Sequence, residues 1–218
     1  MPGTFITFEG IDGSGKSTQL RLVSNYLKDA GCKLVLTREP GGTTLGLRLR
    51  AALLDANETV DPLTELLVFA ADRAQHVRRV LRPALEQDQV VISDRYADAT
   101  VAYQGAGRGF KPELISEIIQ LATEGLKPDL TLLFDVPVSE STSRTTRRSG
   151  PRNKPDRLDI ERVDFHERVR AAYLKIAAEE PGRVKVIDTS GPVEVTQHRL
   201  RKVLLPFLES RGHLVKTK

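Results

Sequence analysis

The fold is decided by residues 4–18, which read Thr-Phe-Ile-Thr-Phe-Glu-Gly-Ile-Asp-Gly-Ser-Gly-Lys-Ser-Thr. Within them, Gly10–Ser17 match the pattern G-x-x-x-x-G-K-[ST]. A short apolar strand is expected before this loop, over Phe5–Phe8, and a helix-like run follows it, over Gln19–Leu27. This order predicts a loop whose backbone N–H groups, together with the N-terminus of the following helix, hold an anion such as phosphate.

The loop offers both backbone and side-chain groups to a nucleotide. Its glycines can adopt backbone angles that are closed to other residues. Lys16 is expected to reach the β- and γ-phosphates, and the Ser17 hydroxyl to bind Mg²⁺. A glycine-rich turn with a chance lysine is the alternative, but strand, spacing, Lys-Ser pair and helix all agree with phosphate binding. The residues expected to bind ATP are Gly10, Ile11, Asp12, Gly13, Ser14, Gly15, Lys16, Ser17 and Thr18.

The composition is that of an ordinary globular protein. With 218 residues, 39% of them hydrophobic, we expect one domain over residues 1–218. The net charge of +4 suits anionic substrates without requiring nucleic acid as a partner. Cys32 is the single cysteine, so no disulfide can form within the chain. We find no signal peptide and no apolar run of about 18 residues, and therefore expect a cytoplasmic protein without a membrane span.

Strand and helix signals alternate along the chain, which predicts an α/β fold with a parallel sheet flanked by helices. Short runs rich in Val, Ile, Leu and Phe predict buried strands at Phe5–Phe8, Lys33–Thr37, Val90–Ser93, Leu130–Asp135 and Val184–Ile187. Helices are expected at Lys16–Ala30, Thr44–Leu54, Pro62–Glu86, Pro112–Glu124, Val138–Arg148, Ile160–Glu179 and Val193–Arg211.

An acidic residue and an arginine follow the strand Val90–Ser93. At the carboxyl end of a strand in a P-loop fold, Asp94 can hold Mg²⁺ directly or through water. Arg95 can grip a second phosphate with its forked guanidinium. A surface ion pair is an equal alternative for such a pair taken alone. The phosphate-binding loop expected in the same sheet favours the functional interpretation.

The predicted helix Pro62–Glu86 carries a possible base-binding pair. We expect its apolar stripe to face the core: Leu63, Leu66, Leu67, Ala70, Ala74, Val77 and Leu81. Phe69 and Arg73 lie one turn apart, outside this stripe. Together they could stack on and hydrogen-bond a planar heterocycle, although helix geometry alone favours packing against a neighbouring helix.

Polar residues follow the Asp94-Arg95 turn closely. Thr100, Tyr103 and Gln104 lie just past a strand end, where such side chains can line a substrate pocket. We interpret the glycine-rich segment Gly105–Gly109 as a flexible turn.

The segment 144–159 is rich in basic residues and almost free of apolar side chains. It contains Arg144, Arg147, Arg148, Arg152, Lys154 and Arg157. A solvated charged loop is the simplest interpretation of such a run. In a phosphoryl-transfer enzyme, however, arginines on a closing lid would stabilise the moving phosphate and exclude water. The expected phosphate-binding loop favours a mobile lid here.

At this point the chain resembles the bacterial thymidylate kinases, which phosphorylate dTMP to dTDP with ATP. The resemblance covers nearly the whole chain. It rests on the ordered motifs Phe8–Gly13, Thr37–Thr43, Phe69–Arg73, Asp94–Tyr96, Ala102–Gly105, Pro128–Thr131 and Asp156–Asp159. It implies a nucleoside-monophosphate-kinase fold with a five-stranded parallel sheet in the order 2-3-1-4-5, and a homodimer.

The resemblance also implies roles for individual residues. Phe69 would stack on thymine, and Arg73 would hydrogen-bond a ring carbonyl. Thr100 would reach the ring edge, and Tyr103 would disfavour a 2′-hydroxyl. The other implied substrate contacts are Asp12 at the 3′-hydroxyl, Arg95 and Arg50 at the monophosphate with Arg38 a weaker candidate, Gln104, and Asp159. The implied catalytic residues are Lys16, Asp94, Arg95, Arg147 and Arg157, and the metal ligands are Ser17 and Asp94.

The chain departs from the family pattern in two places. One family type carries a catalytic arginine within the phosphate-binding loop, whereas Asp12–Gly15 contain none. The chain therefore resembles the type that supplies arginines from the lid. Asp159 stands where the lid motif usually has glutamate, so a contact from this shorter acid could require water.

Two alternatives belong to other functional classes or substrates. The first is a P-loop kinase for another base, against which Phe69, Arg73 and Tyr103 argue. The second is a P-loop switch or nucleic-acid-dependent ATPase. Residues 153–156 read Asn-Lys-Pro-Asp, which spells the guanine-reading motif of GTP switches. The motif lies in an arginine-rich loop rather than after a buried strand, which favours coincidence.

Overall fold

Parallel strands form a central sheet in the computed structural model, which describes residues 3–55, 57, 59–148, 156–158 and 160–214. The strand order is β2-β3-β1-β4-β5, as the resemblance implied. All four pairings between neighbours are parallel. The strands are β1 Thr4–Glu9, β2 Leu34–Arg38, β3 Val90–Asp94, β4 Leu130–Asp135 and β5 Val184–Asp188. Each predicted strand is therefore confirmed to within one or two residues at its ends.

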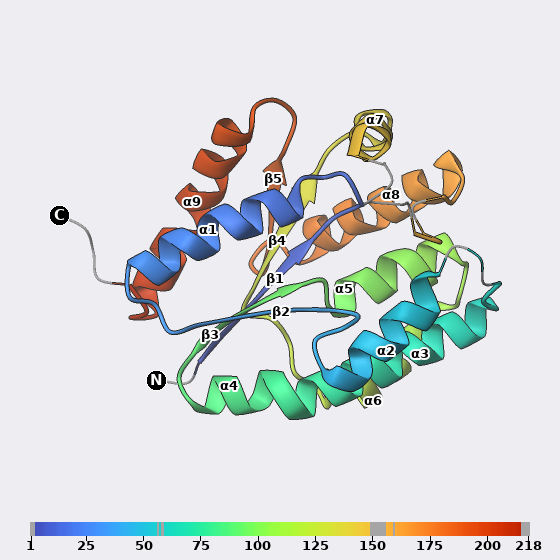
Figure 1. Cartoon of the computed structure of the whole chain (residues 1–218), viewed down its shortest axis with the longest axis horizontal. Coiled ribbons are helices and arrows are strands. Elements are labelled where there is room, and N and C mark those ends of the chain that lie inside the picture. The colour runs from blue at the N-terminus through green and yellow to red at the C-terminus, as the bar shows by residue number, and fades with distance from the viewer. Residues whose placement is uncertain (1–2, 56, 58, 149–155, 159, 215–218) are drawn as a thin grey trace.

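Helices cover both faces of this sheet (Figure 1). On one face lie α1 Lys16–Asp29 and α9 Val193–Ser210. Other elements cover the second face and the carboxyl edge. These are α2 Thr44–Leu54, α3 Pro62–His76, the π-helix η1 Val77–Leu81, α4 Arg82–Glu86, α5 Ala97–Thr100, the π-helix η2 Val101–Gly107, α6 Pro112–Thr123, α7 Val138–Arg148 and α8 Val163–Glu179.

Alternate residues of β1 point into the two halves of the core. Ile6 and Phe8 pack with Leu200 and other apolar residues of α1 and α9. Phe5 packs with Val77 beneath η1 and α4. Because this strand is buried on both faces, it carries apolar side chains in both registers, and the buried Thr7 hydroxyl is paired with that of Thr131 at 2.7 Å.

The carboxyl ends of β1, β2 and β3 meet at one edge of the sheet. Phe8 lies opposite Asp94, and Asp94 lies opposite Arg38. The phosphate-binding loop leaves β1 at this edge, with β3 on one side and β4 on the other. In open parallel sheets, ligands bind outside the carboxyl ends of the strands. The topology therefore brings the predicted site residues of three strands together.

The long helix predicted at Pro62–Glu86 is continuous but not uniform. Residues Val77–Leu81 form a π-helical turn between α3 and α4. Pro83 lies just after this turn and lacks the N–H group that would bond back to the carbonyl of Arg79. A π-turn is one way to accommodate such a missing hydrogen bond.

The core stripe predicted for this helix is wrong in part. Leu63 and Leu67 are 48% and 52% exposed, whereas Glu65 and Arg73 are buried. The helix therefore directs polar side chains inward and some leucines outward. The periodicity could not show this, because it finds an apolar face without showing what covers it.

The helix over Ala97–Gly107 was not predicted, and the expected flexible turn at Gly105–Gly109 is wrong as far as Gly107. This segment contains two glycines, which favour helix poorly. Packing against α8 compensates, because a Cβ atom on Gly107 would lie only 2.6 Å from the ring of Phe165. None of the described helices is both long and apolar enough to cross a membrane.

Candidate active site

The loop between β1 and α1 has the positive-φ backbone that its glycines permit. Gly10, Gly13 and Gly15 all have positive φ, at 133°, 77° and 91°. A Cβ atom on Gly10 would lie 2.3 Å from the carbonyl oxygen of Phe134, so no other residue fits there. Gly15 is also the N-cap of α1 and makes no side-chain capping bond, so the N-terminus of this helix lies at the end of the loop, where an anion is favourable.

Lys16 is buried beneath the loop, at 6% exposure. Its Nζ donates to the carbonyl oxygens of Gly10 at 2.8 Å and Ile11 at 3.3 Å. Burial and the nearby Arg95 guanidinium lower the pKa of Lys16. The ammonium group is thus held against the loop carbonyls, and Lys16 lines the cleft beside the loop.

Asp94 and Ser17 suit a magnesium ion that is shared with phosphate. The Oδ1 atom of Asp94 is buried and has no hydrogen-bond partner among the described residues. Ser17 stands exposed in the first turn of α1 and lines the same cavity. The described residues contain no group of three His, Cys, Asp or Glu side chains placed to hold a metal. Mg²⁺ bound through one carboxylate, a hydroxyl and phosphate oxygens needs no such group.

Arg95 and Asp12 form the central ion pair of the site. The Nη2 atom of Arg95 lies 2.9 Å from both carboxylate oxygens of Asp12. Burial alone would raise the pKa of Asp12, but Arg95 and Lys16 outweigh it and hold that pKa well below its usual range. The Tyr103 hydroxyl also donates to Asp12, at 3.2 Å, and the Arg95 guanidinium lies 4.8 Å from the Tyr103 ring centre.

Glu9 lies in the same hydrogen-bond network as this ion pair, and it was not predicted as a site residue. Its carboxylate accepts hydrogen bonds from the Tyr96 backbone N–H and the Tyr173 hydroxyl, both at 2.7 Å. Burial and the nearby Asp98 raise the pKa of Glu9 to about 8, although Arg95 opposes the shift. Because Tyr173 also faces Arg95, Glu9 belongs to the network that fixes Arg95.

A second pocket adjoins this pair and contains the predicted base-binding residues. Arg73 is almost completely buried and makes three hydrogen bonds through separate nitrogens. Nε donates to Glu39 at 2.8 Å, Nη1 to the Thr100 hydroxyl at 2.8 Å and Nη2 to the Tyr96 carbonyl at 2.9 Å. This second pocket, called the base pocket below, is lined by residues that include Phe69, Arg73, Thr100, Tyr103, Gln104 and Leu158.

Glu39 was also not predicted as a site residue. It accepts from Arg73 through one carboxylate oxygen and lies 2.8 Å from His76 Nδ1 through the other. Thr37 contacts the second ring nitrogen of His76 at 2.6 Å. Burial opposes the charge on Arg73, but Glu39 raises the pKa of that guanidinium. Arg73 is therefore held by a buried counter-ion rather than by helix packing alone.

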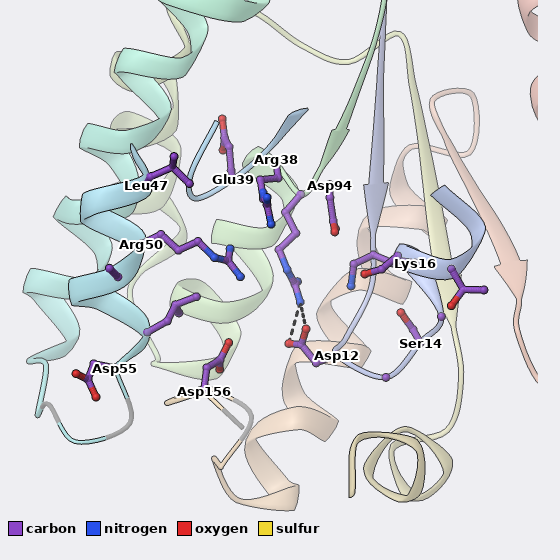
Figure 2. A pocket seen from close by; sticks show the side chains of 17 residues that line it. Asp12, Ser14, Lys16, Arg38, Glu39, Leu47, Arg50, Asp55, Asp94 and Asp156 are labelled. Carbon is purple, nitrogen blue, oxygen red and sulfur yellow. Dashed lines mark hydrogen bonds and ion pairs between the residues drawn. The ribbon is translucent and has the colours of Figure 1, made fainter. Parts of the chain in front are cut away.

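A cleft of about 630 Å³ separates the loop from α2. Figure 2 shows Arg38 and Arg50 pointing into it across from Lys16, with Asp94 above the lysine. Arg50 Nη1 donates to the Pro40 carbonyl at 3.1 Å. Burial and the neighbouring Arg38 lower the pKa of Arg50, because its positive charge is poorly compensated. An incoming phosphate would compensate it.

The described lid residues take different positions. Arg144 contacts the loop, with Nη1 3.5 Å from the Gly13 carbonyl, and donates to the Thr189 carbonyl at 2.8 Å. Arg147 is exposed and donates to Ser143 on its own helix. Arg157 is buried and donates to Glu65 at 2.6 Å, away from the loop. The phosphate contacts expected of Arg147 and Arg157 stay predictions.

Several predicted lid features lie outside the described residues. They are Asp159, Arg152 and residues 153–155 of the Asn-Lys-Pro-Asp motif. Asp156, the last residue of that motif, is described and lines both the cleft and the base pocket.

A smaller cavity of about 280 Å³ lies on the other side of the phosphate-binding loop. It is lined by Gly13, Arg144, Thr189 and Gly191, among others. The loop after β5 carried no sequence signal that marked it as part of the site. Only the parallel pairing of β4 and β5 brings it beside the phosphate-binding loop.

Three buried acids were missed by sequence reasoning, namely Glu9, Glu39 and Glu65. Each accepts hydrogen bonds from residues of the two pockets. Glu65 gave one usable signal, because it interrupts the run Leu63-Thr64-Glu65-Leu66-Leu67. A charged residue within an apolar helical run is rarely buried unless it is paired.

The fold and this site define a P-loop nucleoside monophosphate kinase. Comparisons with known proteins agree. Residues 8–200 match the family model described as thymidylate kinase. The chain is 47% identical over 217 residues to the thymidylate kinase of Pelobacter propionicus, covering 97% of this chain and 98% of the relative. It is 50% identical over 204 residues to that of Nitratidesulfovibrio vulgaris, covering 91% and 95%.

A solved structure shares the fold. The crystal structure of thymidylate kinase from Ehrlichia chaffeensis superimposes with a TM-score of 0.75 at 37% sequence identity. The match covers 94% of this chain and 100% of that one. The chain therefore belongs to the thymidylate kinase family and is a kinase of thymidylate.

Proposed function

We propose that the chain phosphorylates dTMP to dTDP by direct, in-line transfer of the γ-phosphoryl group of ATP. The observation that carries this mechanism is the lining shared by the two pockets. Asp12, Arg50 and Arg95 line both the cleft beside the phosphate-binding loop and the base pocket. An acceptor held in the base pocket would thus have its phosphate facing the loop.

On the donor side, the loop Gly10–Thr18 holds the ATP phosphates through backbone N–H groups. Lys16 stabilises negative charge on the γ-phosphoryl group as it moves. Mg²⁺, held by Ser17 and Asp94 together with phosphate oxygens, would supply further charge neutralisation. The buried, unpartnered Oδ1 of Asp94 supports this assignment.

On the acceptor side, Phe69 stacks on the thymine ring and Arg73 donates to a ring carbonyl. Tyr103 and Asp12 lie against the deoxyribose, and Thr100 and Gln104 complete the base pocket. Arg50 and Arg95 bind the monophosphate. No general base is required, because the acceptor phosphate is already an anion, so positioning and charge supply the catalysis.

The lid segment would close over both nucleotides. Arg147 is the candidate for a direct phosphate contact, and Asp159 for a contact to the acceptor. Arg144 supports this role for α7, because it already reaches the Gly13 carbonyl. The cavity between Arg144 and Gly191 would receive the adenine of ATP. We further propose that the reaction takes place in the cytoplasm, where ATP is available as the donor.

A substrate panel tests the proposed reaction. ADP release from ATP would be measured with dTMP, dUMP, dCMP, dGMP and UMP, and separately with single-stranded DNA. We expect dTMP to give the highest kcat/KM and DNA to give no stimulation. A preference for another base would support the alternative kinase, and stimulation by DNA would support the ATPase.

We also propose that the chain forms a homodimer through α2, α3 and α6. These helices are neighbours (Figure 1), and each of them carries exposed large apolar side chains. The exposed residues are Leu45, Leu47, Leu63, Leu67, Leu114 and Leu121. Such a concentration of apolar side chains on adjacent elements is typical of an interface.

The test of the homodimer is the molar mass in solution, measured by light scattering. We expect twice the chain mass for the wild type and a shift toward monomer for Leu67→Glu. Val195→Glu, which places the same charge on an exposed position of α9, is the control and should leave the mass unchanged. A monomeric wild type would contradict the proposal.

A further inference from the structure

Glu65 lies at the centre of a buried polar cluster between the base pocket and the end of the lid segment. The residue on α3 is 0% exposed, yet three side chains donate to its carboxylate. Gln104 Nε2 lies 2.8 Å from Oε1, Arg108 Nη2 2.9 Å from Oε2, and Arg157 Nη2 2.6 Å from Oε2. These hydrogen bonds outweigh burial and lower the pKa of Glu65, so the acid is charged.

Arg157 connects this cluster to the carboxyl end of α2. Its Nε donates to the Leu53 carbonyl at 3.0 Å, and its backbone N–H donates to the Leu54 carbonyl at 3.3 Å. The last carbonyl groups of a helix have no partners within the helix, and a cation near them is favourable. One arginine therefore joins α2 to α3.

The residues on either side of Arg157 belong to the substrate pockets. Asp156 lines both the cleft and the base pocket, and Leu158 lines the base pocket. Leu158 is buried in the apolar cluster that also contains Tyr103, with Phe69 packed against it. Fixing Arg157 thus fixes part of the wall that faces the acceptor nucleotide.

We propose that Glu65 and Arg157 are positioning residues for the acceptor nucleotide. The Glu65 carboxylate orients the Gln104 amide and, through Arg157, holds Asp156 and Leu158 against the base pocket. Arg157 then acts as an anchor at the end of the lid segment and does not bind phosphate. This inference rests on the assignment of the base pocket to dTMP.

Burial favours the pair of Arg157 with Glu65 over a phosphate contact for Arg157. Moving the guanidinium to a phosphate would separate a buried ion pair and leave Glu65 with one cationic partner fewer. It would also remove the hydrogen bond from Nε to the Leu53 carbonyl at the end of α2, the helix that carries Arg50. Arg144, by contrast, is already beside the loop.

The test is calorimetric titration of dTMP into the protein without ATP, with kcat measured separately. Glu65→Gln and Arg157→Met are each expected to raise the dTMP Kd about tenfold, which corresponds to about 1.4 kcal/mol. The dTMP Kd of the double variant should be no higher than that of the single variant with the higher Kd, because both changes break the same Glu65–Arg157 contact. Direct phosphate contact predicts instead an unchanged dTMP Kd and losses in kcat that multiply in the double variant. That result would overturn the proposal.

Two further comparisons keep the test decisive. Glu161→Gln removes a carboxylate that bonds Arg108 at 2.7 Å from outside the cluster, and it should leave the dTMP Kd unchanged. Arg157→Lys keeps a charge for Glu65 but loses the paired contact to Leu53, so it should be intermediate and can replace Arg157→Met if that variant unfolds. If the wild type binds another monophosphate instead of dTMP, the proposed function is wrong. The same variants titrated with that monophosphate would then show, independently, whether Glu65 and Arg157 position the acceptor.

Discussion

The proposed donor and acceptor halves of the site are built in different ways. One continuous segment, Gly10–Thr18, makes most of the donor half, largely from backbone groups shaped by glycines of positive φ. The acceptor half is made of side chains from α2, α3, α5 and η2, from the turns after β2 and β3, and from Asp12, Asp156 and Leu158. Buried acids hold these side chains, with Glu39 beneath Arg73 and Glu65 beneath Gln104 and Arg157.

This difference indicates where each half is vulnerable. A site made of backbone amides depends on loop geometry and on one lysine. A site made of side chains depends on ion pairs that are removed from water, whose loss leaves an uncompensated charge. Substitutions far from the acceptor can therefore weaken its binding while leaving the donor loop intact.

The largest effect is expected in the donor half. Lys16→Ala removes the ammonium group that is proposed to stabilise the transferred phosphate. We expect kcat to fall by about 100- to 1000-fold, the usual cost of losing one preorganised electrostatic contact to the transition state. Coupled measurement of ADP release gives the rate. A near-normal kcat would show that the loop is not the donor site.

Glu9 gives a stability test at the junction of the two halves. The pKa of its carboxyl group is raised to about 8, whereas a glutamate in the unfolded chain has a pKa near 4.5. Between these values the folded state binds a proton that the unfolded state has lost. Stability from this group is therefore complete below about pH 4.5 and is lost as the pH rises through 8.

Glu9→Gln, which imitates the protonated acid, should already exceed wild type in unfolding free energy near pH 6, and its excess should be about 2 kcal/mol larger near pH 8, because wild type loses about 1.4 kcal/mol per pH unit between the two pKa values. Urea unfolding at the two pH values measures the difference. Glu180→Gln, an acid whose pKa is lowered rather than raised, is a control that should show no such gain with rising pH. Equal gains at both pH values would mean that Glu9 is already ionised at pH 6.

Phe69→Ala should separate the two halves directly. Loss of stacking on one base costs about 1–3 kcal/mol, so the KM for dTMP should rise roughly tenfold or more while the KM for ATP stays near its wild-type value. Steady-state kinetics with each nucleotide varied in turn measures both. Equal losses for the two substrates would contradict a stacking role.

The sequence was sufficient to predict the strands and the glycine-rich loop of the proposed donor half, because local patterns determine them. Apolar runs mark buried strands, and G-x-x-x-x-G-K-[ST] fixes a loop whose function is in its backbone. It also named Phe69, Arg73, Thr100, Tyr103 and Gln104 as one pocket, but this rested on resemblance to a family rather than on helix geometry.

The remaining acceptor features could not be predicted, because they arise from contacts across long sequence separations. Glu65 and Arg157 are 92 residues apart, and Arg73 and Glu39 are 34 apart. Apolar periodicity likewise failed on α3, where buried charges face inward and Leu67 faces outward. A pattern records which face is apolar, but it does not reveal the partners that make a charged face buried.

The separate construction of the two halves is tested most directly at Arg73, which lines the base pocket and is bonded to Glu39, Thr100 and Tyr96. Lysine keeps the charge but cannot make three bonds in a fixed plane. Calorimetric titration of Arg73→Lys with each nucleotide separately should show the dTMP Kd raised about tenfold and the ATP Kd unchanged. An unchanged dTMP Kd, or an ATP Kd that rises equally, would contradict the account.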